Sequence, residues 1–113
     1  MDEKKELLEN INEYLIKARE SEENSYNVAV TLYFKAIAVL IDLFILEKEG
    51  YIPSNHNERF RLLENKYNLL YKILDKDFPV YQRSYRIKLT KEHVKILKND
   101  FEEVLKFTNI KIL

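Results

Sequence analysis

The scarcity of chain-breaking residues constrains the fold of this chain more than any other feature. Its 113 residues include one glycine, Gly50, and two prolines, Pro53 and Pro79. A β-sandwich or β-barrel needs a turn signal roughly every 8–12 residues, and three such residues cannot supply them. Hydrophobic residues make up 46% of the chain, enough for one core in a domain of this length. The sequence therefore predicts a single all-α domain over residues 1–113.

The longest apolar stretch indicates which helix lies at the centre of that domain. Nearly every position in 28–46 is apolar, and the few exceptions, which include Lys35 and Asp42, fall in one narrow helical stripe. A helix that is apolar around most of its circumference is buried by several neighbours. We expect a helix over 26–49 with Gly50 as its C-cap. Lys35 and Asp42 lie two turns apart, so each needs a partner from another helix or from a second chain.

Four further segments show the hydrophobic spacing of helices. We expect a first helix over 4–21 capped by Asp2, and a third helix from a Ser54 or Asn55 cap to about residue 75, with a kink near Asn65. A short fourth helix restarts at Asp77 and Pro79 and runs to about residue 87, and Thr90 caps the last helix. Short connections favour antiparallel neighbours. The expected architecture is an up-and-down bundle of four to five helices with a long buried central helix.

Charge and residue content exclude several functional classes. Nineteen Lys and Arg residues balance nineteen Asp and Glu residues, whereas a dedicated nucleic-acid-binding domain usually carries a basic excess. There is no cysteine and there are two histidines, so thiolate zinc sites, iron–sulfur clusters and three-histidine metal sites within one chain are excluded. We expect no metal and no cofactor.

The same features predict where the protein resides and how it associates. The charges of Lys35 and Asp42 argue against a membrane span, since each would cost about 2.5–3.5 kcal/mol at a bilayer centre. The N-terminus is amphipathic, unlike a signal peptide, so we expect a cytoplasmic protein. A net charge of zero favours self-association, and the exposed part of the central helix is the expected contact of a homodimer.

Two stretches of the chain resemble one protein family. Residues 24–43, Asn-Ser-Tyr-Asn-Val-Ala-Val-Thr-Leu-Tyr-Phe-Lys-Ala-Ile-Ala-Val-Leu-Ile-Asp-Leu, resemble the central helix of HEPN-domain proteins (higher eukaryote and prokaryote nucleotide-binding). Residues 53–60, Pro-Ser-Asn-His-Asn-Glu-Arg-Phe, are similar to a string before the third helix of small stand-alone archaeal members. The resemblance covers roughly residues 20–107. It implies an HEPN-like bundle that interacts with nucleotides or RNA, as half of a toxin–antitoxin pair or beside a nucleotidyltransferase partner.

The resemblance also implies candidate catalytic residues. Many HEPN proteins are metal-independent ribonucleases whose motif is Arg, four to six residues, then His, and Arg86 and His93 match it with six intervening residues. By this resemblance His93 is the general acid or base for cleavage through the RNA 2′-hydroxyl, and Arg86 holds the phosphate. However, Ile87 stands where active members carry a polar residue, and the Thr90 cap places Arg86 and His93 on different segments. The expectation therefore leans towards a binding module without catalysis.

Four residues are candidates for binding, and each has a structural alternative. Arg83 lies between Tyr81 and Tyr85, and alternating aromatic and guanidinium groups stack on bases and hold phosphates. The spacing of the two tyrosines equally fits a core-facing helical stripe. His56 is either an anchor of the third helix or a ligand-binding residue, and His93 is either a surface residue of a first helical turn or a general base.

Two other expectations come from the same reading. Arg59 and Arg61 are expected to be solvated or paired with Glu58 and Glu64. Two alternative functions stay open: a non-catalytic protein-interaction or structural bundle, and a metal-independent endoribonuclease.

Overall fold

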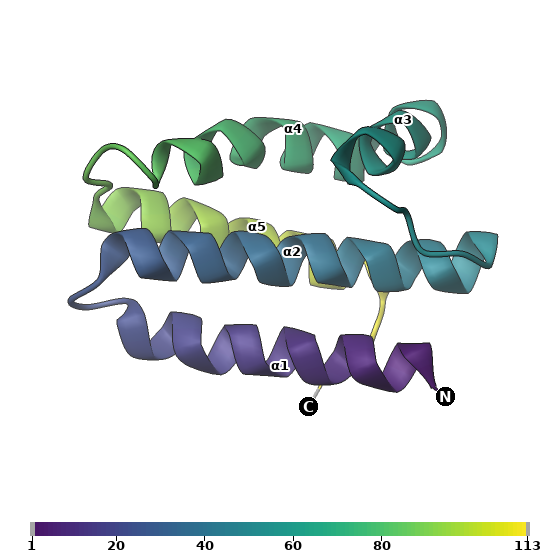
Figure 1. Cartoon of the computed structure of the whole chain (residues 1–113), viewed down its shortest axis with the longest axis horizontal. Coiled ribbons are helices and arrows are strands. Elements are labelled where there is room, and N and C mark those ends of the chain that lie inside the picture. The colour runs from purple at the N-terminus through teal and green to yellow at the C-terminus, as the bar shows by residue number, and fades with distance from the viewer. Residues whose placement is uncertain (1, 113) are drawn as a thin grey trace.

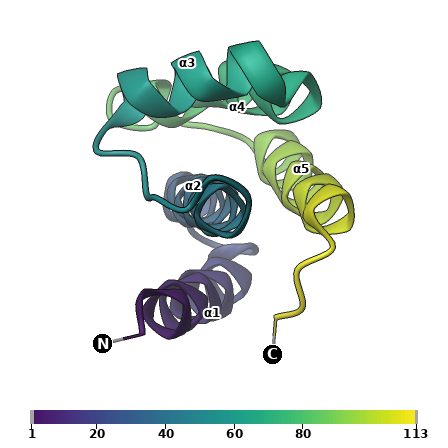
Figure 2. The same ribbon diagram turned by 90° about the vertical axis from the view of Figure 1, so that its right-hand side faces the viewer.

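The computed structural model describes residues 2–112, and this part of the chain is all-helical with no strand. The helices are α1 (Glu3–Ser21), α2 (Tyr26–Glu49), α3 (His56–Lys66), α4 (Asn68–Arg83) and α5 (Lys91–Thr108). Figure 1 shows α2 in the middle with α1 antiparallel to it, and Figure 2 shows α3 lying across the bundle. The prediction of an all-α bundle of four to five helices with a central second helix is confirmed.

The core of the bundle is built around α2. Thirteen of its 24 residues are buried, because α1, α4 and α5 all pack against it. By length and composition α2 could also cross a membrane, but 72% of its most apolar window is buried inside the protein. The packing of its neighbours therefore accounts for its apolar character.

The ends of four helices use the capping chemistry that the sequence predicts. Asp2, Asn55 and Thr90 each accept a hydrogen bond from a backbone N–H three residues further along, which satisfies a donor that the first helical turn leaves free. Of the two candidates for the start of α3, Asn55 is the cap. Gly50 ends α2 with φ 87°, a left-handed conformation that glycine adopts without a steric penalty.

The predicted third helix is two helices: the chain breaks at Tyr67, close to the kink predicted near Asn65, and only the expected extent of one helix to residue 75 is wrong. The chain leaves the helical conformation at Tyr67, where φ is −133° and ψ is 68°. The Tyr67 hydroxyl donates to Glu49 at 2.6 Å, and its ring meets the Phe44 ring edge-on with centroids 5.0 Å apart. These contacts with α2 hold Tyr67 in place and separate α3 from α4.

Pro79 lies inside α4, so the predicted helix restart at Asp77 is wrong. A proline within a helix removes one backbone hydrogen bond and is tolerated only where packing offsets that loss. Phe78 and Val80, on either side of Pro79, both pack against the core. The helix ends at Arg83 rather than at residue 87. The side chain of Asn27, on α2, hydrogen-bonds the backbone of Ser84 and Ile87 and holds this segment outside the helix.

Candidate functional site

The connection between α4 and α5 is held in one path by Asn27 of α2. The Asn27 amide nitrogen donates to the carbonyl oxygens of Ser84 at 2.9 Å and Ile87 at 2.7 Å, and its oxygen accepts from the Leu89 N–H at 2.9 Å. One side chain thus satisfies three backbone groups over residues 84–89. Sequence reasoning missed this role, although a polar residue on an otherwise apolar helix is the signal that could have found it.

Replacing Asn27 with alanine is expected to lower the free energy of unfolding by about 2–3 kcal/mol, since three hydrogen bonds at roughly 1 kcal/mol each are lost. Asn27→Asp keeps the acceptor for the Leu89 N–H and loses both donated hydrogen bonds. A substantial part of the same decrease in the free energy of unfolding is therefore expected for Asn27→Asp. Urea unfolding monitored by circular dichroism measures both. The matched control is Asn24→Ala on the exposed loop before α2. A midpoint for Asn27→Ala equal to that of the control contradicts the assignment.

A row of aromatic rings leads from the core to the surface beside this connection. The Phe34 and Tyr81 rings stack with centroids 4.6 Å apart, and the Tyr81 and Tyr85 rings meet edge-on at 5.7 Å. The two tyrosine hydroxyls are 2.9 Å apart. Phe34 is 2% exposed and Tyr85 is 72% exposed. The core-stripe alternative therefore holds for Tyr81 and is wrong for Tyr85.

Positive charge gathers around the exposed Tyr85 ring. Residues 79–91 contain four basic residues and no acidic residue. Arg83, Tyr85 and Arg86 line one shallow cavity of about 490 Å³. Within residues 2–112 neither arginine forms an ion pair, whereas Lys91 pairs with a glutamate at 3.4 Å. We call Arg83, Tyr85, Arg86 and Lys88 the basic edge.

The two candidate catalytic residues lie on different elements. Arg86 is exposed in the connection, and His93 is half-buried in the first turn of α5. No polar contact between described residues joins them, and His93 does not line the cavity that contains Arg86. The His93 Nδ1 accepts the Thr90 backbone N–H at 3.1 Å, so the neutral ring carries its proton on Nε2. The structure thus gives His93 a role in the capping box of α5, and catalysis by this pair stays a prediction.

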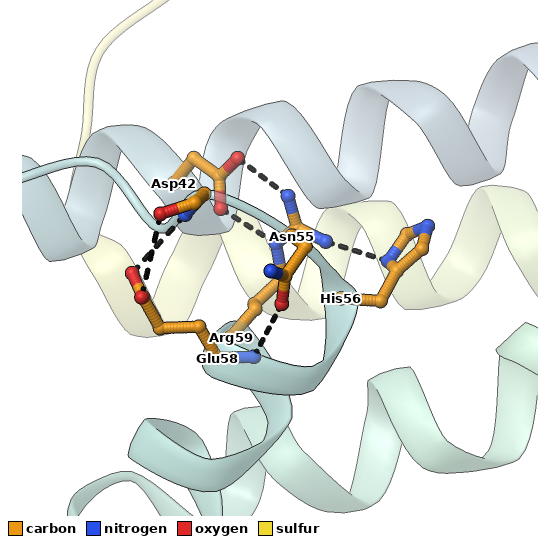
Figure 3. A network of polar contacts seen from close by, with 6 residues as sticks. Asp42, Asn55, His56, Glu58 and Arg59 are labelled. Carbon is orange, nitrogen blue, oxygen red and sulfur yellow. Dashed lines mark hydrogen bonds and ion pairs between the residues drawn. The ribbon is translucent and has the colours of Figure 1, made fainter.

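A buried polar network joins α3 to α2, and it overturns the expected surroundings of Arg59. Arg59 is 8% exposed and donates from Nε and Nη2 to both carboxylate oxygens of Asp42, at 2.6 and 2.7 Å (Figure 3). The expectation that Arg59 is solvated or pairs with Glu58 or Glu64 is wrong, since Glu58 turns back to Ser54 at 3.1 Å. Asp42 thereby finds its partner on another helix of the same chain.

His56 completes this network at its outer end. Its Nδ1 lies 2.6 Å from Arg59 Nη1 and must be the acceptor, because a guanidinium group only donates. Burial, followed by the positive charge of Arg59, lowers the pKa of His56. The ring is therefore neutral at pH 7 with its proton on Nε2. His56 lies 4.9 Å from Phe78, centroid to centroid, and shares a cavity with Tyr81, so the structure brings three of the four candidate binding residues into one aromatic row.

Two carboxyl groups that sequence reasoning did not single out meet between α4 and α5. They are Asp77 of α4 and Asp100 of α5. Asp77 is fully buried, and within residues 2–112 neither of its carboxyl oxygens has a hydrogen-bond partner. Burial and then the interaction with Asp100 raise the pKa of Asp77. Lys76 Nζ lies 2.9 Å from Asp100. Asp77 is thus a buried acid that stays protonated at neutral pH beside the Lys76–Asp100 ion pair.

Neither a metal nor a known relative defines this site. Within residues 2–112 no group of three His, Asp or Glu side chains is placed to hold a metal ion. No protein-family model, curated protein or solved structure matches the chain. The geometry and chemistry of the residues described above are therefore the basis for assigning a function.

Proposed function

We propose that this protein is an HEPN-like helical module that binds single-stranded RNA through its basic edge and does not cleave it. The observation that carries the proposal is the exposed Tyr85 ring between Arg83 and Arg86, neither of which is paired with a carboxylate among residues 2–112. Stacking of a base on an aromatic side chain contributes roughly 1–3 kcal/mol. Guanidinium groups beside the ring can hold the phosphates on either side of the stacked base.

The rigidity of the edge supports the same proposal. The Tyr85 hydroxyl is held by Tyr81, and the backbone around it is held by Asn27. A ring that is already oriented loses little conformational entropy on binding. Single-stranded RNA is the fitting ligand because its unstacked bases are accessible to an exposed ring, whereas the bases of a duplex are not.

The position of His93 supports binding without cleavage. A general base needs a free nitrogen lone pair within reach of the proton that it removes. In neutral His93 that lone pair, on Nδ1, accepts the Thr90 N–H at the start of α5. The homodimer, the nucleotidyltransferase or toxin–antitoxin pairing and the cytoplasmic location stay predictions from the sequence.

Tyr85→Ala is expected to weaken the binding of a fluorescein-labelled single-stranded RNA of about 12 nucleotides by at least tenfold, which corresponds to one lost stacking contact. Arg83→Ala and Arg86→Ala are each expected to lower the slope of log Kd against log salt by about 0.7, the value for one phosphate contact on a single strand. Fluorescence anisotropy in EDTA at several salt concentrations measures both effects.

The matched controls are Tyr51→Ala, an exposed tyrosine after α2, and Arg61→Ala, an exposed arginine of α3. Both are expected to bind as tightly as the unchanged protein. Equal losses in the controls, or no RNA binding by the unchanged protein, overturn the proposal. If the unchanged protein cleaves the RNA and His93→Ala does not, the protein is an endoribonuclease instead.

A further inference from the structure

A second cavity, separate from the shallow one at the basic edge, lies between the first four helices. The rings of Tyr14, Phe34 and Tyr81 and the aliphatic Ala38 form its apolar walls, and its polar groups include Lys35 and His56. Its volume is about 170 Å³, and no acidic residue lines it. The cavity thus combines apolar walls with a cation and has no carboxylate to neutralise that charge.

The two nitrogen groups are positioned by the surrounding structure. Lys35 Nζ lies 5.8 Å from the centroid of the Tyr81 ring, and within residues 2–112 it forms no ion pair. His56 is fixed by Arg59, which is itself held at two points by Asp42, as Figure 3 shows. Because Nδ1 of His56 is occupied, Nε2–H is the donor that this ring has left. The cavity therefore presents one charged donor and one neutral N–H donor.

The volume and the charge together define the ligand. An apolar protein cavity of roughly 150 Å³ holds one benzene molecule, so about 170 Å³ accommodates a single ring but not a nucleotide. An unpaired ammonium group and an N–H donor that line the same cavity are together complementary to one carboxylate. We propose that this cavity binds a small organic acid, a single planar ring that carries one carboxylate. The carboxylate contacts Lys35 and the Nε2–H of His56, and the ring lies beside Tyr81.

Benzoate is the probe for this proposal, and benzamide is its neutral isostere. In ¹H–¹⁵N NMR titrations of the full chain, benzoate is expected to shift the amide signals of residues around Lys35, Ala38 and Tyr81. Benzamide is expected to bind at least tenfold more weakly, and Lys35→Met is expected to weaken benzoate binding at least tenfold. Lys35→Arg, which keeps the charge, is expected to retain binding.

Lys48→Met is the matched control, because Lys48 Nζ also lies 5.8 Å from an aromatic centroid, that of Phe44, on the same helix. Equal binding of benzoate and benzamide, an equal loss in Lys48→Met, or shifts centred on Arg83 and Arg86 would each overturn the proposal. The NMR spectrum of free Lys35→Met shows whether that variant is folded. If it is not folded, the proposal is decided by whether Lys35→Arg binds benzoate at least tenfold more tightly than benzamide. The proposal does not rest on RNA binding, so Arg83→Ala/Arg86→Ala is expected to bind benzoate unchanged.

Discussion

Arg59→Leu is expected to lower the free energy of unfolding by about 3–5 kcal/mol, the largest loss expected for any single substitution considered for this protein. The substitution leaves the carboxylate of Asp42, 8% exposed, buried without its partner. Removing one member of a buried ion pair is strongly destabilising because the other charge stays desolvated. Urea unfolding at pH 7, followed by circular dichroism, measures the difference.

Two further variants separate the buried charge from lost packing. Asp42→Leu/Arg59→Leu removes both charges and is expected to regain most of the stability, since buried pairs are often replaceable by apolar residues. Arg61→Leu, on the exposed side of the same helix, is expected to change stability by less than about 0.5 kcal/mol. A double variant no more stable than Arg59→Leu would show that the effect comes from packing and not from the unpaired carboxylate.

Asp77→Asn is expected to make the protein more stable than the unchanged chain at neutral and alkaline pH. Burial and then the interaction with Asp100 raise the pKa of Asp77 to about 9 from 3.8. Between these values the folded state holds a proton that the unfolded state has released. Stability therefore falls as pH rises from about 4 to about 9, by up to roughly 1.4 kcal/mol per pH unit. Asparagine has nearly the same size as aspartic acid and does not ionise, so it removes this loss.

The measurement is the free energy of unfolding of both proteins at intervals from pH 4 to pH 9. The stability advantage of Asp77→Asn is expected to grow with pH and to reach several kcal/mol at the alkaline end. Asp75→Asn, an exposed carboxyl on the same helix, is the control and is expected to show no such trend. Parallel pH profiles for the unchanged chain and Asp77→Asn would mean that Asp77 ionises normally in the folded state.

The string on which part of the family resemblance rests has a structural explanation here. In residues 54–59, Asn55 caps α3, Glu58 turns back to Ser54, and Arg59 joins His56 to the buried Asp42. The Arg59–Asp42 pair attaches the start of α3 to α2, as Figure 3 shows. Packing against α4 also holds α3, and this network is its buried polar connection to α2.

Prediction from the sequence was accurate where local chemistry decides the outcome. The bounds of α2, its cap at Gly50 and the caps Asp2 and Thr90 follow from hydrophobic period and from the hydrogen-bonding needs of helix ends. It placed a kink near Asn65, close to the break at Tyr67, but did not predict two separate helices, and it failed at Pro79. The break at Tyr67 is held by contacts with α2, and Pro79 is tolerated because its neighbours pack against the core. Both depend on residues that are distant in sequence.

The candidate site divides in the same way. The sequence by itself determined that Arg83, Tyr85 and Arg86 stand in a segment with basic and no acidic residues, and that one long apolar helix is central to the bundle. Only the tertiary structure decided that Tyr85 faces solvent while Tyr81 packs on Phe34, that Asp42 pairs with Arg59, and that Asn27 holds the connection. The reason is physical: a pattern records which residues share a helix face, whereas their partners depend on how separate helices pack.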